Sequence, residues 1–321
     1  MNNKNKSKKS FIALLILFNM TTFLFASSKN EKSLSPSVSK NAHEKVIYLT
    51  FDDGPSSGTN AVINILKEEG VEATMFFIGE NVVANENLFQ KALNMPNLLI
   101  ANHTYAHANG RYARFYSDPI GVFTDIDKAQ DTIGGAKYLR LAGRNVWRLP
   151  ELSKNDSALS RSRRNIEKEA YNLLEVGGYQ IYGWDIEWGF SHKTGYALWG
   201  AESMYDKLER RYESGKLRKN DKIVLLAHDR MFRNRLGKRR LRAFIKLMKL
   251  NGWSFNTLTT YSNSTPDTIV RNSAKTKEKL VRIAKKMLKA PSTKKKKMKR
   301  RDPLKIFNIV KDDKIKMYLI G

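Results

Sequence analysis

The strongest constraint on the fold is an alternation of short apolar runs with longer helical patterns, which begins at Lys45 and continues to about residue 260. Strand–helix alternation is typical of βαβ units and of a parallel sheet. Seven such steps favour an α/β fold, a distorted (β/α) barrel of about seven parallel strands, with an open doubly wound sheet as the alternative. The predicted strands are residues 45–51, 73–78, 98–102, 145–149, 179–186, 222–228 and 253–259, and the predicted helices are 59–69, 86–94, 121–140, 157–176, 202–215 and 238–250.

Both ends of the chain differ from this body in charge. Residues 1–10 are polar and basic and precede an apolar run over 11–26, which is typical of a signal peptide or membrane anchor. The formal net charge is +27, and residues 262–321 carry 19 basic and 5 acidic side chains. Four segments follow: a signal peptide or anchor (1–28), a linker (29–44), a central domain (45–261) and a basic helical and hairpin extension (262–321).

The two ends of the chain also predict where the protein is located and what it binds. The signal pattern predicts a protein of the periplasm, the cell envelope or the medium, held at the membrane by residues 11–26 if they are not cleaved. The basic extension predicts an anionic envelope polymer or a membrane surface as partner. No nucleic-acid-binding motif is present, and nucleic acid is not expected as a partner. The chain has no cysteine, which excludes a disulfide framework, a thiolate metal site and a cysteine nucleophile.

Polar motifs follow several of the predicted strands, and such strand ends meet at one edge of a parallel sheet. TFDDGP (50–55) supplies two adjacent carboxylates, and HTYAH (103–107) supplies two histidines four residues apart, a spacing that suits one metal. RLPE (148–151), WDIEW (184–188) and LLAHD (225–229) follow three further strands. Each motif alone is as readily a turn, a surface pair or a structural ion pair. Their recurrence at successive strand ends indicates one site.

In this order the five motifs resemble the polysaccharide deacetylase family, which shares the NodB homology domain, over roughly residues 45–260. The resemblance implies a distorted barrel and a hydrolase that removes N-acetyl groups from aminosugars of a cell-envelope glycan with a divalent metal, foremost zinc. The implied metal ligands are Asp53, His103 and His107. The implied general base is Asp52, the general acid is His228, and the arginine that orients the base is Arg148.

Other residues follow from the resemblance less directly. Leu226 matches the leucine of the acetyl pocket, and Trp188 and Tyr105 are expected to bind substrate, with a backbone N–H near Tyr105 facing the oxyanion. Two motifs depart from the family pattern. Glu151 stands where an aromatic residue is usual, and the two carboxylates of WDIEW are spaced differently, so either Asp185 or Glu187 could support His228.

Two other functions are compatible with the sequence. One is a deacetylase of a lipid-linked aminosugar at the membrane, and the other is a non-catalytic cationic protein that binds the envelope. The complete set of Asp52, Asp53, His103, His107 and His228 favours an enzyme over the binding protein.

Overall fold

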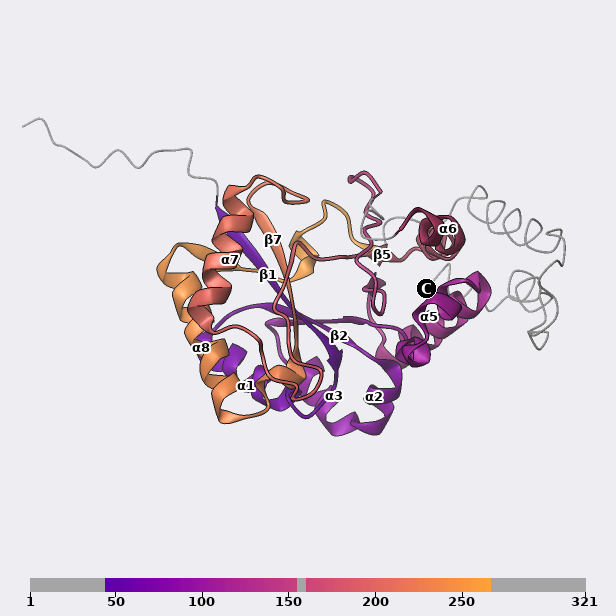
Figure 1. The fold of residues 1–321 in the computed structure, drawn as a ribbon. Coiled ribbons are helices and arrows are strands. Elements are labelled where there is room, and N and C mark those ends of the chain that lie inside the picture. Colours follow the sequence, from indigo (N-terminus) through magenta and orange to yellow (C-terminus); the bar gives the residue numbers. More distant parts are fainter. Residues whose placement is uncertain (1–43, 155–159, 267–321) are drawn as a thin grey trace, which may run out of the picture. The chain divides into compact units, whose positions relative to one another are not determined.

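The computed structural model of the chain describes residues 44–154 and 160–266 (Figure 1). The predicted signal peptide or anchor, nearly all of the predicted linker, and the basic extension from residue 267 lie outside the described residues. Within the described part, no helix is both long enough and apolar enough to cross a membrane.

The body is built on one curled sheet in which every ladder is parallel. The strand order is β5-β4-β3-β2-β1-β7-β6, and β8 pairs with β1 beside this path. The two end strands are not paired with each other, so the seven strands form a half-barrel; the prediction of a distorted (β/α) barrel is confirmed. The strands are β1 (Lys45–Gly54), β2 (Ala73–Phe77), β3 (Leu98–Asn102), β4 (Tyr138–Leu139), β5 (Gln180–Ile181), β6 (Ile186–Glu187), β7 (Lys222–His228) and β8 (Trp253–Phe255).

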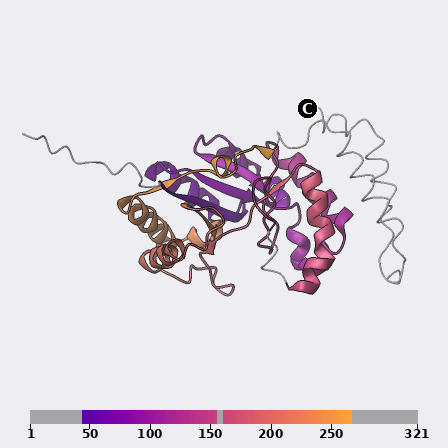
Figure 2. The same cartoon turned by 90° about the horizontal axis from the view of Figure 1, so that it is seen from above.

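Helices cover the convex side of this sheet, with α7 and α8 on one side of the central strands and α6 on the other (Figures 1 and 2). Helix α5 is capped by Asp118, whose carboxylate accepts a hydrogen bond from the N–H of Gly121 at 3.1 Å. The helices are α1 (Thr59–Glu69), α2 (Gly79–Ala84), α3 (Glu86–Leu93), α4 (Tyr112–Tyr116), α5 (Pro119–Ile133), α6 (Arg161–Val176), α7 (Ala201–Glu213) and α8 (Arg235–Leu250), with the short 3-10 helices η1 (His107–Gly110), η2 (Asp229–Phe232) and η3 (Leu258–Thr260).

Strand β1 is buried on both faces, which explains its continuous apolar sequence. Ile47, Leu49 and Phe51 pack against the helices. Tyr48 faces the concave side, where it contacts the ring of Tyr261 at 5.0 Å between centroids. Because β1 lies between β2 and β7, the residues at its carboxyl end reach the middle of the sheet edge.

Three of the predicted strands are wrong in place or extent. Of the predicted strand 253–259, only Trp253–Phe255 forms β8, and η3 begins at Leu258. Gly134 and Gly135 both have positive φ and end helix α5, which leaves Tyr138 free to start β4; residues 145–149 contribute only an antiparallel bridge between Arg148 and Ile181. The predicted strand 179–186 divides into β5 and β6, which lie at opposite ends of the sheet path. The chain turns near Gly183, where a Cβ would lie 2.1 Å from Asn145 Oδ1.

Candidate metal and acid–base site

The carboxyl end of β1 places two adjacent carboxylates in different surroundings. Asp52 is still in register with His228 of β7, whereas the ladder with β2 becomes irregular between Phe51 and Gly54. Asp53 has a φ of 70°, which is uncommon outside glycine, and its carbonyl accepts a hydrogen bond from Asn81 Nδ2 at 2.9 Å. This backbone turn lets one carboxylate face the histidines while the other stays beneath them.

The end of β3 supplies the two histidines through a similarly constrained backbone. Asn102 Oδ1 accepts a hydrogen bond from the N–H of Thr104, which has a φ of 71°. His107 begins η1 with a φ of 45°. Non-glycine residues with positive φ cost free energy and cluster at functional sites. The turn from His103 to His107 is therefore typical of a functional site.

Asp53, His103 and His107 present one ligand atom each, and these atoms lie within 4.8 Å of one another. Asp53 Oδ1 is 3.4 Å from Nε2 of His103 and 3.2 Å from Nε2 of His107. This oxygen is buried, yet it accepts no hydrogen bond from any residue of the described ranges. A buried anionic oxygen that faces two imidazole nitrogens without hydrogen bonding fits a bound cation, and two imidazoles with one carboxylate is a ligand set of catalytic zinc.

Arg140 connects Asp52, the expected base, to the candidate metal site, and the sequence analysis missed it. Its side chain is fully buried, and Nη1 donates to Asp52 Oδ1 at 2.9 Å and to Thr50 Oγ1 at 2.6 Å. Its carbonyl oxygen lies 2.9 Å from His103 Nδ1. Because a carbonyl only accepts, Nδ1 carries a proton, and Nε2, which faces Asp53, is the ring nitrogen left for a metal.

Arg148, which the resemblance gave as the partner of the base, lies elsewhere. Its Nη1 donates to the carbonyl of Trp147 at 3.1 Å, and its Nε is 3.9 Å from Glu175. The structure therefore puts Arg140 in the position expected of Arg148. The doublet Arg-Leu occurs at 140–141 and at 148–149. This repetition is the one sequence signal that Arg140, and not Arg148, could contact Asp52.

His228 completes the group from the end of β7. Its Nε2 is 3.9 Å from Asp53 Oδ2, and its ring contacts Phe190 at 4.7 Å between centroids. Burial lowers the pKa of His228, against the opposing charges of Asp52 and Asp53. Among the described residues, its Nδ1 is buried without a hydrogen-bond partner.

Of the two carboxylates in WDIEW, Glu187 is the one whose charge acts on His228. It is exposed and pairs in register with Leu226 on β7. Asp185 instead accepts hydrogen bonds from the N–H groups of Val224 at 2.8 Å and Arg218 at 3.1 Å, so it fixes the chain between strands.

The expected substrate-binding residues have separate places. Leu226 is buried on β7 beside β1. Trp188 is wholly buried and its Nε1 donates to the carbonyl of Trp199 at 3.1 Å; it is a core residue, and its expected contact with substrate is corrected. Tyr105 is half-buried beneath Lys128, and its N–H already donates to Asp125 Oδ1 at 2.8 Å, so that group does not face an oxyanion.

Three further residues shape the site without a sequence signal. Tyr112 packs edge-on against His107 at 5.7 Å between ring centroids, and Phe190 packs in the same way against His228. Asp229 is fully buried, and its Oδ1 accepts a hydrogen bond from Ser56 Oγ at 2.6 Å. It also accepts one from Thr59, so it ties η2 to the loop after β1. Glu151 lies outside this group, where Lys219 Nζ at 2.9 Å and Ser262 Oγ at 3.0 Å contact it.

Together, the fold and these side chains define a parallel α/β half-barrel with a candidate metal site and a candidate acid–base pair at the carboxyl edge of its sheet. Residues 39–166 match the family model described as polysaccharide deacetylase. The resemblance stated from the motifs is confirmed by this match, which makes the segment similar to polysaccharide deacetylases.

Individual relatives agree with this family. The chain is 25% identical over 308 residues to a chitin disaccharide deacetylase of Vibrio alginolyticus, covering 67% of this chain and 71% of the relative. It is 26% identical over 193 residues to a putative polysaccharide deacetylase of Bacillus subtilis, covering 59% of this chain but only 60% of the relative. The catalytic domain of a peptidoglycan N-acetylglucosamine deacetylase from Eubacterium rectale shares the fold, with a TM-score of 0.51 at 20% identity over 69% of this chain and 92% of that domain.

Proposed function

We propose that the protein is a metal-dependent hydrolase that removes N-acetyl groups from aminosugar residues of a cell-envelope polysaccharide and releases acetate. The observation that carries the proposal is the convergence of the Asp53, His103 and His107 ligand atoms beside a carboxylate, Asp52, that Arg140 holds in place. A purely structural cluster would have no need of an orphaned carboxylate oxygen at its centre.

Asp53, His103 and His107 would hold a divalent metal, zinc foremost. Bound there, the metal would supply an acidified water and an electrophilic centre for the amide carbonyl. His103 is oriented for this by its Nδ1–H, which donates to the carbonyl of Arg140.

The remaining steps belong to the protein's own side chains. Asp52 uses one carboxylate oxygen to accept from Arg140, which fixes the other 3.7 Å from His103 Nε2; it accepts a proton from the attacking water. His228 carries a proton at Nε2 and gives it to the departing nitrogen as the C–N bond breaks. The products are acetate and a glycan amine. Glu187 favours the protonated form of His228 through its charge.

Acetate release tests the proposal directly. Purified protein is incubated with chitooligosaccharides, peptidoglycan, poly-N-acetylglucosamine and a lipid-linked aminosugar, each with and without a chelator. We expect release from at least one soluble or wall glycan, its loss after chelation, and its return with a divalent metal. Acetate release from the lipid-linked substrate alone would favour the alternative function, a deacetylase of a lipid-linked aminosugar. If the metal-loaded protein releases acetate from none of the substrates, the proposal is contradicted.

Export and envelope attachment stay predictions from segments that lie mostly outside the described residues. Export is supported by the basic and apolar pattern of residues 1–28, and attachment by the charge of residues 262–321. Cell fractionation tests export. A truncation after Pro266 tests attachment, because it keeps the contacts of Glu151 with Ser262 and Asn263. Equal sedimentation of the truncated and complete chains with cell-wall material at low salt would refute an attachment role for the tail.

A further inference from the structure

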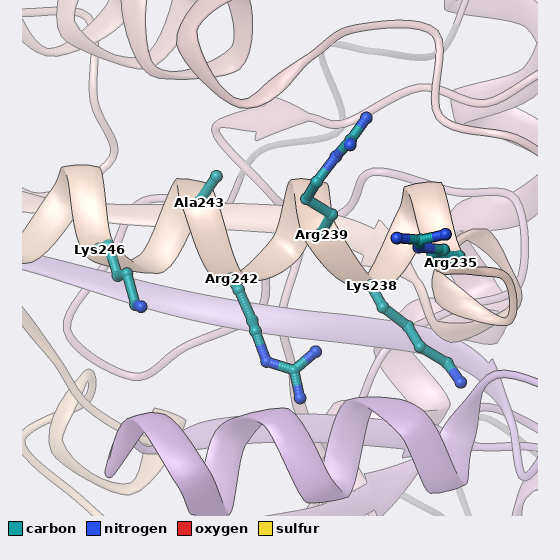
Figure 3. Close-up of a pocket in the computed structure, with 6 residues that line it drawn as sticks. All are labelled: Arg235, Lys238, Arg239, Arg242, Ala243 and Lys246. Carbon is teal, nitrogen blue, oxygen red and sulfur yellow. The ribbon is translucent and has the colours of Figure 1, made fainter.

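Helix α8 carries an exceptional charge on its outer surface. It contains seven basic residues and no acidic residue. Five of the basic residues line a hollow of about 600 Å³ on the surface of the helix, where Ala243 is the only other lining residue (Figure 3). We call these five the α8 basic row: Arg235, Lys238, Arg239, Arg242 and Lys246.

The row runs along one face of the helix. Arg235, Arg239 and Lys246 are exposed, and the spacing of four, then three, then four residues through Arg242 keeps the side chains on one face. At a rise of about 1.5 Å per residue, the charges recur every 4.5–6 Å over about 16 Å. Figure 3 shows Lys238 and Arg242 on one side of α8 and Arg239 on the other.

Acidic neighbours neutralise only part of the row. Arg242 pairs with Glu68 of α1, and Lys246 Nζ lies 3.9 Å from Glu69. Arg235, Lys238 and Arg239 have no ion pair with any residue in the described ranges. Several like charges held side by side raise the local potential and attract a multivalent anion.

The opposite face of α8 explains why the row has this orientation. Leu241, Phe244 and Ile245 are fully buried against the sheet, so the core fixes the rotation of the helix and with it the direction of the cations. Two residues, Arg233 and Asn234, separate the helix from η2, which directly follows His228. One end of the row is therefore connected to the catalytic edge of the sheet by a short segment, residues 229–234.

We propose that the α8 basic row binds a linear polyanion, with phosphate or carboxylate groups repeated along an extended chain, and leads that polymer toward the catalytic edge. Cations that follow one another along a helix match the repeated charges of an extended polymer better than they match a flat membrane surface. The large apolar side chains exposed on α8, Leu236 and Leu250, are 14 residues apart, so α8 lacks the continuous apolar face that membrane-binding helices insert into lipid. The row lies outside the proposed catalytic group, so this binding can fail without affecting the proposed chemistry.

The test compares two variants of the complete chain that lose the same charge. One is Arg239→Gln/Arg242→Gln/Lys246→Gln, and the matched control removes three exposed lysines elsewhere, Lys154→Gln/Lys168→Gln/Lys216→Gln. Fluorescence anisotropy measures the binding of labelled inorganic polyphosphate and, separately, of labelled polyglutamate over a range of salt concentrations. The two probes distinguish a phosphate from a carboxylate partner.

We expect the α8 variant to bind at least one probe about 10- to 100-fold more weakly at low salt, with the slope of log K against log salt reduced by about 2 to 3. The control should change by about 3-fold or less, because only distant charges are lost. Acetate release from a small soluble substrate should stay unchanged in both.

A parallel sedimentation with anionic phospholipid vesicles tests a membrane partner. Three results would overturn the proposal: equal losses in the two variants, no loss in either, or a loss that occurs with the vesicles and with neither polymer probe. If the triple variant does not fold, Lys238→Gln/Arg239→Gln replaces it, since neither side chain has an ion pair in the described part of the chain.

Discussion

The assignment of Arg140 as the positioning residue of the base gives a sharp prediction, because the chain offers a matched control. The guanidinium of Arg140 donates to Asp52, to Thr50 and to the carbonyl of Gly183, the last at 2.8 Å. Arg140→Lys keeps the positive charge but removes this planar group of donors. A lysine amine can satisfy only part of this set, so the carboxylate of Asp52 is no longer held in one orientation.

The magnitude follows from these contacts. Lost or misplaced buried hydrogen bonds cost about 1–3 kcal/mol for each group left unsatisfied, so we expect Arg140→Lys to lower the free energy of unfolding by about 2–4 kcal/mol. Misplacing a catalytic group by about 1 Å can lower the rate 100-fold, and we expect kcat to fall by about that factor with a small change in KM. The metal content should be retained, because the carbonyl that contacts His103 belongs to the backbone.

Arg148→Lys is the control. Arg148 is also buried, so it too should lose stability, but in the described part of the chain it contacts Trp147 and Glu175 and does not contact Asp52. We expect its kcat to stay within about 3-fold of the parent, since a structural role acts on folding yield and not on turnover of folded protein.

The assay combines acetate release, metal analysis and urea unfolding on each purified variant. In an Asp52→Asn background, Arg140→Lys should add little to the loss of kcat, because the two residues act as a unit. Retention of parental kcat in Arg140→Lys would refute the reasoning, and so would a loss in Arg148→Lys as large as that in Arg140→Lys.

The other predictions concern metal, acid–base chemistry and pH. His103→Ala/His107→Ala should lose both metal and activity, and full metal occupancy by elemental analysis would remove the ligand assignment. Asp52→Asn and His228→Ala should keep the metal but lose about 10²–10⁴-fold in acetate release, whereas near-parental turnover in either would show that its role is structural. Burial raises the pKa of Asp229 from 3.8 to about 6. The pKa of this carboxyl is higher in the folded protein than in the unfolded chain, so the folded protein binds the proton more tightly. The protonated carboxyl therefore adds to the free energy of unfolding at low pH, and this contribution is lost as the pH rises through about 6. In chelator-treated protein, Asp229→Asn should therefore remove about 2 kcal/mol of the fall in unfolding free energy between pH 4 and pH 8, and an identical pH dependence of the two proteins in urea titrations would contradict this account.

The sequence by itself determined the class of fold and the residues that gather at the candidate site. Alternation of strand and helix patterns gave the parallel sheet, and motif order placed Asp52, Asp53, His103, His107 and His228 at strand ends, because parallel strands carry their carboxyl ends to one edge. Local signals also set most helix limits; α1 runs from Thr59 to Glu69 as predicted, since Gly70 takes a left-handed conformation at its end.

Tertiary structure decided which arginine meets the base and which aromatic residues face the site. Arg140 and Arg148 are each followed by leucine, and their neighbours in sequence cannot tell which one will cross the sheet to Asp52. That choice depends on the glycine pair that ends α5, so that β4 begins at Tyr138 and Arg140 follows β4 toward the interior. Trp188 is a comparable case: a tryptophan beside charged residues suggests a sugar platform, but the packing of Phe232 and Phe244 around its ring places it in the core. Burial and partner choice are set by residues distant in the chain, so no local pattern carries them.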